Sequence, residues 1–206
     1  MSELALKLIH ENIKKHQSGE NTRSLDLGNC GLTEVPDEIG QCTWLEELNF
    51  AATSWHWDGK KWNEWRSQNT GESNHISQLP NSLSKLKNLK RLNVSSESNQ
   101  PHDINDISII SELKELQELY FWNTKVSDLI PLTKLTNLQT LIFFQTQVSD
   151  LAPLTGLNSL QYLECSSTPV ANLSPLTGLN SLQHLYCSYT SVADLSPLAA
   201  LTSLQH

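Results

Sequence analysis

Residues 116–203 read LQELYFWNTKVSDLIPLTKLTN, LQTLIFFQTQVSDLAPLTGLNS, LQYLECSSTPVANLSPLTGLNS and LQHLYCSYTSVADLSPLAALTS, four units of 22 residues that align without a gap. Three columns are apolar in every unit: Leu119, Leu141, Leu163 and Leu185; Val126, Val148, Val170 and Val192; Leu129, Leu151, Leu173 and Leu195. One such unit buries little apolar surface alone, so repetition at a fixed period predicts a stack of similar coils that share one core.

Spacing within the unit predicts its local structure. Leu119 and Phe121 are apolar and stand two positions apart, which indicates a short strand with both side chains inward. In every unit a proline lies ten residues after the second inward position and favours a tight 3₁₀ turn on the outer side. We expect the Thr row to bond the backbone of the adjacent coil, and the Asp row to cap the outer turns. These rows are Pro131, Pro153, Pro175 and Pro197; Thr124, Thr146, Thr168 and Thr190; and Asp128, Asp150 and Asp194.

The pattern LxxLx(F/C)xxTxVxxLxPLxxLxx is that of a leucine-rich repeat with Thr where Asn or Cys is more usual. It predicts an α/β repeat solenoid: a leucine-rich repeat horseshoe with a parallel concave sheet and a short 3₁₀ or irregular convex side. Less regular units begin at Thr22, Leu45 and Leu89. Residues 22–206 thus make about seven turns, with a Trp-rich insertion at about 53–75.

The sequence predicts different structures at the two ends of the stack. Residues 2–16 predict a helix capped by Ser2, with Leu4, Leu8, Ile9 and Ile13 inward, so that residues 1–21 form an N-terminal capping helix. The last unit has no comparable cap, which places Leu201 and Leu204 beside an open edge. We therefore expect a fragment that lacks its C-terminal cap or following domains.

Composition narrows the class of partner. The net charge of −8 argues against a nucleic-acid binder, which would show a basic face. No stretch has the roughly 18 apolar residues of a membrane span, and the N-terminal segment lacks the apolar core of a signal peptide. We expect a cytoplasmic protein that binds neither nucleic acid nor membrane.

The residue types that carry chemistry show no catalytic or metal-ligand spacing. Cys30, Cys42, Cys165 and Cys187 include no CxxC pair and are expected to be buried free thiols. His56 near Asp58 and His102 beside Asp103 are expected to be surface pairs. No phosphate loop, nucleophile elbow or HExxH motif occurs. The sequence predicts no enzyme, no metal and no cofactor.

Strand positions that face away from the core change character along the chain. They are polar or small in the first three turns and aromatic from the fourth. The candidate binding residues are Tyr120, Trp122, Ile142, Phe144, Tyr162, Tyr186 and Tyr189. A contiguous exposed aromatic patch is typical of an interface. The alternative is that exposed strand positions favour aromatic residues in any case.

The insertion holds Trp55, Trp57, Trp62 and Trp65, which flank the turn Asp58-Gly59-Lys60 and predict a hairpin. Two interpretations stay open. The tryptophans pack against the flank of the solenoid, or they form a second platform for a ligand or partner.

Two families resemble the chain. The last four repeats are similar to the short bacterial type of internalins, LxxLxLxxNxIxDIxPLxxLTN, with Thr in place of Asn. The N-terminal half looks like the repeat domains of bacterial Roco proteins, through RSLDLGNCGLTEVPDEIG, TWLEELNF, the Trp-rich insertion and ISQLPNSLSKLKNLKRLNV. In Roco proteins such a domain precedes a Roc GTPase and a COR dimerisation module, and is implicated in regulating them.

The resemblance and the aromatic positions together suggest a protein–protein interaction and regulatory module of a larger cytosolic signalling protein, which binds through its concave face. Its partner would be another protein or a neighbouring domain of the same chain. The alternative is an internalin-like adhesion protein. The sequence leaves the oligomeric state open.

Overall fold

The structure, a computed structural model, describes residues 2–57, 61–97 and 101–205, without the side chains of Ser54, His56 and Trp57. The expected pair of His56 with Asp58, and the expected turn at residues 58–60, therefore lie outside the described residues.

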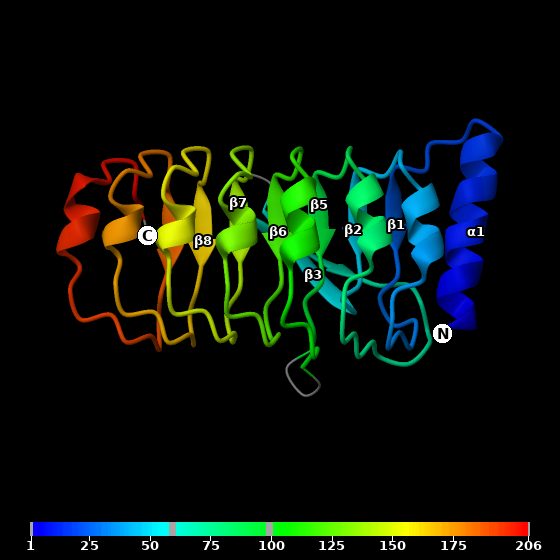
Figure 1. Cartoon of the computed structure of the whole chain (residues 1–206), viewed down its shortest axis with the longest axis horizontal. Coiled ribbons are helices and arrows are strands. Elements are labelled where there is room, and N and C mark those ends of the chain that lie inside the picture. The colour runs from blue at the N-terminus through cyan, green and yellow to red at the C-terminus, as the bar shows by residue number, and fades with distance from the viewer. Residues whose placement is uncertain (1, 58–60, 98–100, 206) are drawn as a thin grey trace.

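A seven-stranded parallel sheet runs along the molecule in the order β1-β2-β5-β6-β7-β8-β9 (Figure 1). Each strand is three residues long: β1 (Ser24–Asp26), β2 (Glu47–Asn49), β5 (Arg91–Asn93), β6 (Glu118–Tyr120), β7 (Thr140–Ile142), β8 (Tyr162–Glu164) and β9 (His184–Tyr186). Leu119 is paired with Leu141, and Leu141 with Leu163, so the repeat columns of the sequence are columns of the sheet. The predicted leucine-rich repeat solenoid is confirmed.

Short 3₁₀ helices form the opposite, convex side, as expected. They are η1 (Asp37–Gln41), η2 (Asn81–Lys85), η3 (Ser108–Glu112), η4 (Ile130–Leu132), η5 (Ala152–Leu154), η6 (Ser174–Leu176) and η7 (Ser196–Ala200). A proline stands in the first turn of η4 to η7. The predicted Asp caps are confirmed: the carboxylate of Asp128 accepts from the Ile130 N–H at 2.8 Å, and Asp150 and Asp194 repeat the contact.

The core lies between these two layers. Its leucine, isoleucine and valine columns form one continuous cluster from α1 to the last coil. Phe121 and Phe143 stack within it with ring centroids 5.6 Å apart. Because a coil buries its side chains against its neighbours, the stability of each coil depends on the next one.

The threonine row corrects one expectation. Thr124 donates to the carbonyl of Phe121 and Thr146 to that of Phe143, both at 2.8 Å, so each hydroxyl bonds its own coil and not the adjacent one. The cause is the residue before the threonine, which takes a left-handed conformation with φ near 55°. This bend returns the hydroxyl to the carbonyl three residues earlier. The left-handed residues are Asn123, Gln145, Ser167 and Tyr189.

Helix α1 (Glu3–Gln17) covers the first coil, as predicted (Figure 1). The hydroxyl of Ser2 caps it by accepting from the Ala5 N–H at 3.3 Å. Ile9 is fully buried, and the other predicted inward residues, Leu4, Leu8 and Ile13, are half-buried against the core.

At the other end, β9 is the last strand of the sheet, and Leu201 of the coil that follows it is buried. Leu204 is half-buried, and the exposed leucine of the last complete coil is Leu195, at 60%.

The cysteines are free thiols. Cys30, Cys42 and Cys165 are buried as expected, whereas Cys187 is only half-buried. Burial raises the pKa of Cys42 to about 11 and, with the charge of Asp26, that of Cys30 to about 12. Thiols with such pKa values carry little thiolate at neutral pH and are poor nucleophiles.

His102 was expected on the surface beside Asp103, and this expectation is wrong. Its ring is buried because the chain returns from the β5 coil beneath Ile76, whose N–H donates to Nδ1 at 3.3 Å. Asp103 instead pairs with His75 and Lys125 on the surface. Burial, helped by the charge of His75, lowers the pKa of His102 from 6.5 to about 4.

This shift predicts a loss of stability in acid. Between pH 6.5 and 4 the unfolded chain binds a proton at His102 that the folded chain does not bind, so the free energy of unfolding falls as the pH falls through this window. The contribution is at most about 3 kcal/mol. Denaturant titrations across these pH values should show that the free energy of unfolding depends less on pH in His102→Gln than in wild type. The control His10→Gln, which replaces an exposed histidine, should keep the pH dependence of wild type. Parallel curves for wild type and His102→Gln would contradict it.

Candidate binding groove on the concave face

The concave face is the side of the sheet that faces away from the core. Strand register places its side chains in three columns. The first holds Ser24, Glu47, Arg91, Glu118, Thr140, Tyr162 and His184, and the second holds Asp26, Asn49, Asn93, Tyr120, Ile142, Glu164 and Tyr186. The third, two residues further along, holds Gly28, Ala51, Ser95, Trp122, Phe144, Ser166 and Ser188. The face is therefore polar over β1, β2 and β5 and aromatic over β6 to β9.

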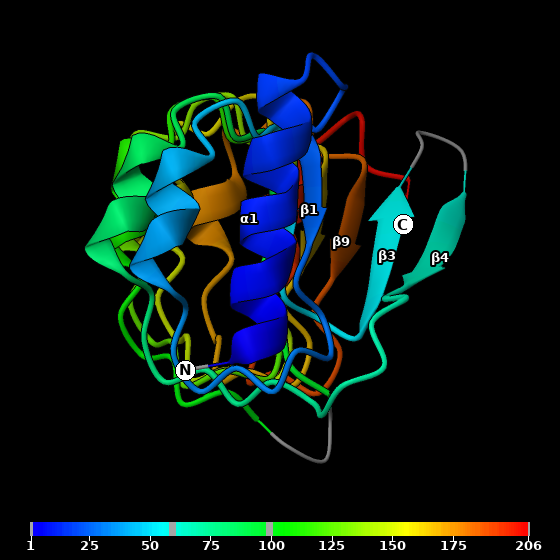
Figure 2. The ribbon, with the colours of Figure 1, turned by 90° about the vertical axis from the view of Figure 1, so that its right-hand side faces the viewer.

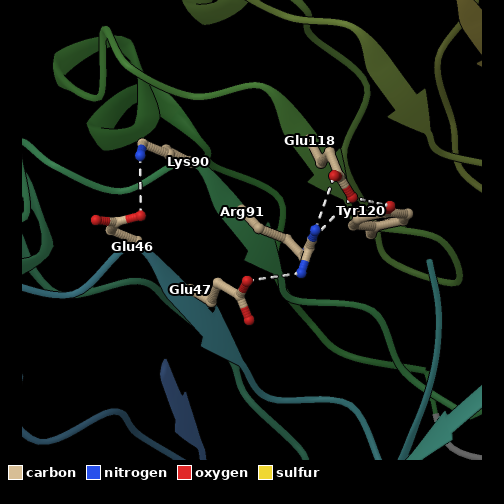
Figure 3. A network of polar contacts seen from close by, with 6 residues as sticks. All are labelled: Glu46, Glu47, Lys90, Arg91, Glu118 and Tyr120. Atoms are coloured by element: carbon tan, nitrogen blue, oxygen red, sulfur yellow. Dashed lines mark hydrogen bonds and ion pairs between the residues drawn. The ribbon is translucent and has the colours of Figure 1, made fainter. Parts of the chain in front are cut away.

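A charged network occupies the boundary between the two regions (Figure 3). Arg91 binds Glu118 through two nitrogens, Nε at 2.8 Å and Nη2 at 2.9 Å, and its Nη1 lies 2.9 Å from Glu47. Tyr120 donates its hydroxyl proton to Glu118. Burial alone would lower the pKa of Arg91, but the hydrogen bond and charge of Glu118, with the charge of Glu47, raise it. Arg91 is therefore fixed as a cation.

The Trp-rich insertion forms the predicted hairpin, β3 (Thr53–Trp57) paired with β4 (Trp62–Arg66). It lies on the side of the sheet opposite the 3₁₀ helices (Figure 2). Ser67 ties its base to the sheet by donating to Asp26 at 2.7 Å and to the Gly28 carbonyl at 3.0 Å. A Cβ on Gly28 would lie 2.8 Å from the Cβ of Ser67 and 2.3 Å from the Ala51 carbonyl, so this approach requires glycine.

The return of the insertion is held by one buried amide. Asn74 accepts from the N–H groups of Cys30 and Leu32 at 3.1 and 2.8 Å, and donates to the carbonyls of Leu27 and Phe50, both at 2.8 Å. Its side chain thus satisfies backbone groups of two coils. The solenoid accommodates the insertion without leaving these groups unpaired.

The hairpin covers part of the aromatic region. Trp62 meets Tyr162 edge to face, with ring centroids 4.8 Å apart, and donates a hydrogen bond to its hydroxyl. Tyr120, Ile142 and Tyr162 form a separate buried cluster there, with Trp62, Trp122 and Phe144 packed on it. The expectation that Tyr120, Ile142 and Tyr162 are exposed is therefore wrong. Burial, with the nearby Tyr186 and Glu164, raises the pKa of Tyr162, and burial with Glu118 raises that of Tyr120.

Beside the hairpin a groove of about 380 Å³ stays open. Trp122 and Phe144, half-buried and stacked with centroids 5.1 Å apart, form one wall. Trp62 and Tyr162 form the other, and Trp55, 45% exposed, adds to the lining. The floor is the second column: Tyr120, Ile142 and Glu164. The structure thus brings together seven of the predicted positions: Trp55, Trp62, Tyr120, Trp122, Ile142, Phe144 and Tyr162.

The remaining tryptophans of the insertion lie elsewhere. Trp65, 40% exposed, lines a second groove of about 270 Å³ with polar residues that include Asp26, Glu47 and Arg91. Trp57 stands opposite Trp62 in the hairpin register, and its side chain lies outside the description. The hairpin therefore separates a polar groove over β1 to β5 from the aromatic groove over β6 to β8.

The last two tyrosines lie beyond the lining of the aromatic groove. Tyr186 packs on Tyr162 with centroids 5.4 Å apart and is partly exposed. Tyr189 is 90% exposed in the turn after β9, with φ 55°. A large side chain in this left-handed conformation is disfavoured, and the equivalent positions carry Asn, Gln and Ser.

Sequence reasoning missed Glu164. It shares the second column with Tyr120 and Ile142, and the 22-residue register of Tyr120 and Ile142 leads directly to it. It was missed because only aromatic and large apolar side chains of this face were predicted to bind a partner.

Among the described residues, no His, Cys, Asp and Glu side chains gather in groups of three or more that could hold a metal ion. Among the same residues, no helix is long and apolar enough to cross a membrane.

Comparison with known proteins agrees with this fold. Residues 114–156 and 136–178 match the family model described as leucine-rich repeats in two copies. No curated protein matches the sequence. Among solved structures, a leucine-rich repeat protein of Leptospira interrogans is 25% identical with a TM-score of 0.72, over 89% of this chain and 41% of its own. The chain therefore spans about two fifths of that protein.

Two further structures have the same fold. Internalin C2 of Listeria monocytogenes is 21% identical with a TM-score of 0.62, over 98% of this chain and 91% of its own. The third structure is the ectodomain of the Arabidopsis thaliana receptor kinase GASSHO1/SCHENGEN3, solved in complex with CASPARIAN STRIP INTEGRITY FACTOR 2. It is 17% identical with a TM-score of 0.66, over 88% of this chain and 20% of its own. The chain carries a leucine-rich repeat domain, a fold that generally mediates protein–protein interaction.

The contact of Trp62 with the buried cluster predicts a stability difference between the two faces of the hairpin. Trp62→Ala should lower the free energy of unfolding by about 2 kcal/mol, because it uncovers Tyr162 and removes an aromatic contact. Denaturant titrations of the variant and the wild type measure this loss in the free energy of unfolding. The matched truncation Trp65→Ala should cost less than half as much, and equal losses would show that the hairpin does not rest on this cluster.

Proposed function

We propose that this protein is a protein-binding module that captures its partner in the aromatic groove between the hairpin and strands β6 to β8. The stacked pair of Trp122 and Phe144 carries the proposal. Both rings are half-buried, ordered against a buried floor and open to the groove. Rigid aromatic side chains in this setting bury much area on binding at little entropic cost, which is the usual character of an interface hot spot.

The hairpin strengthens the proposal. It turns a shallow sheet surface into a groove with two walls, and its own Trp55 and Trp62 belong to the lining. A partner segment in this groove would contact aromatic side chains from both the solenoid and the insertion. This arrangement combines the two interpretations of the tryptophans, since Trp62 packs on the sheet and also helps to form the platform.

A regulatory role in a larger cytosolic signalling protein is the finer proposal. Its support is the resemblance of residues 23–94 to the repeat domains of Roco proteins, in which the partner would be a neighbouring module. Crosslinking and mass spectrometry in the native cell, with p-benzoylphenylalanine in place of Trp55, test it. Crosslinks to a GTPase module or its regulators would support this role, and crosslinks to a host cell-surface protein would favour an internalin-like adhesion function instead.

The groove proposal predicts the effect of removing the stacked wall. Trp122→Ala combined with Phe144→Ala should weaken binding of the crosslinked partner about 100-fold, because each ring at a hot spot contributes about 1.4 kcal/mol or more. Calorimetry with the purified partner measures the affinity.

The control is Ile130→Ala, which truncates an exposed apolar residue on the convex side. It should leave the affinity unchanged. A folded double variant that binds its partner as tightly as wild type would exclude the groove as the binding site.

A further inference from the structure

Glu164 is the one acidic residue in the lining of the aromatic groove. On the neighbouring strands its partners in register are Ile142 and Tyr186, and Tyr162 precedes it on the same face of β8. The carboxylate thus stands among aromatic and aliphatic side chains, between the wall of Trp122 and Phe144 and the wall of Trp62 and Tyr162.

This carboxylate lacks a cationic partner in the part of the chain that the structure describes. Its contact is with Ser166, whose N–H donates to Oε1 at 2.9 Å. Burial raises the pKa of Glu164, and the hydrogen bonds from Ser166 only partly oppose this rise. A carboxylate that is partly removed from water without a counter-charge is stabilised when a cation binds it.

A second glutamate on the same sheet shows which group pairs with such a carboxylate when the partner belongs to this chain. Glu118, one column over and two strands away, also lies beside a tyrosine on the concave face, and it holds the guanidinium of Arg91 with two hydrogen bonds (Figure 3). Glu118 is satisfied within the chain, whereas Glu164 offers a comparable carboxylate toward the groove.

We propose that the aromatic groove takes an arginine side chain of a basic peptide segment, with the guanidinium paired to Glu164 and flanked by the rings of Trp62 and Trp122. This specificity rests on the proposed protein-binding function and names the chemistry of the partner. A guanidinium is planar, stacks on aromatic faces and forms two hydrogen bonds with a carboxylate. The net charge of −8 favours association with a basic partner.

Two other occupants fit less well. A neutral apolar peptide would bury Glu164 without compensating its charge, which costs binding free energy. A carbohydrate would stack on the aromatic rings, and its hydroxyl groups would donate hydrogen bonds to the carboxylate, but it too leaves the negative charge uncompensated.

The test uses the full ¹⁵N-labelled chain and three pentapeptides, acetyl-Gly-Ser-Xaa-Ser-Gly-amide, in which Xaa is arginine, citrulline or leucine. Citrulline has nearly the shape of arginine without its charge. Cellopentaose is the carbohydrate probe. Titrations at millimolar concentration follow the indole N–H resonances of Trp62 and Trp122, assigned with Trp62→Phe and Trp122→Phe. They are repeated with Glu164→Gln and with Glu115→Gln, which removes an exposed carboxylate outside the groove.

The arginine peptide should shift both resonances and bind about tenfold more tightly than the citrulline peptide. Glu164→Gln should remove this difference, and Glu115→Gln should keep it. Equal binding of arginine and citrulline, an unchanged preference in Glu164→Gln, preferred binding of leucine or cellopentaose, or no binding of any probe would overturn the inference. The protein-binding function would then still be judged by the Trp122 and Phe144 double variant with its own partner.

Discussion

Each coil of this protein buries its leucines only against the coils beside it, and this constraint organises the rest of the molecule. A 22-residue unit has one short strand and one 3₁₀ turn, too little to enclose a core alone. Stacking aligns the strands in register, and register in turn fixes which side chains face away from the core. The concave column that holds Tyr120, Ile142 and Glu164 is therefore a direct consequence of how the leucine columns pack.

The hairpin changes what those columns present. Without it, the tyrosines over β6 to β8 would form an open apolar surface, which invites unspecific association. Trp62 covers Tyr162 and leaves the stacked Trp122 and Phe144 beside it. A broad patch thereby becomes a narrow groove with aromatic walls and one carboxylate in its floor. This geometry selects for a ligand by shape and charge, whereas a flat apolar patch selects mainly for area.

The features predicted correctly from the sequence are those that repeat or are local. The leucine columns, the prolines of the 3₁₀ turns, the aspartate caps and the Ser2 cap of α1 each depend on residues within one unit. Long-range contacts were not predictable in the same way. Nothing in the sequence around His102 indicates that the Ile76 N–H will donate to its buried ring. No periodicity indicates that the hairpin folds onto β8, where Tyr162 lies 100 residues after its contact Trp62.

The threonine row failed for a different reason, since its hydrogen bond depends on a left-handed residue that has no single amino-acid type. The position of Glu164, in contrast, could be predicted from the sequence. It lies 22 residues after Ile142, so the repeat that predicts the fold also places Glu164 in the same column.

The docking of the hairpin on the concave cluster is the central claim, and nuclear Overhauser contacts between the indole of Trp62 and the ring of Tyr162 test it most directly. With ring centroids 4.8 Å apart, these rings should give strong cross-peaks, and Tyr120 should stay shielded from solvent. Absence of these cross-peaks, with Trp62 resonances at the positions of a free indole, would contradict the claim and leave the concave face an open aromatic surface.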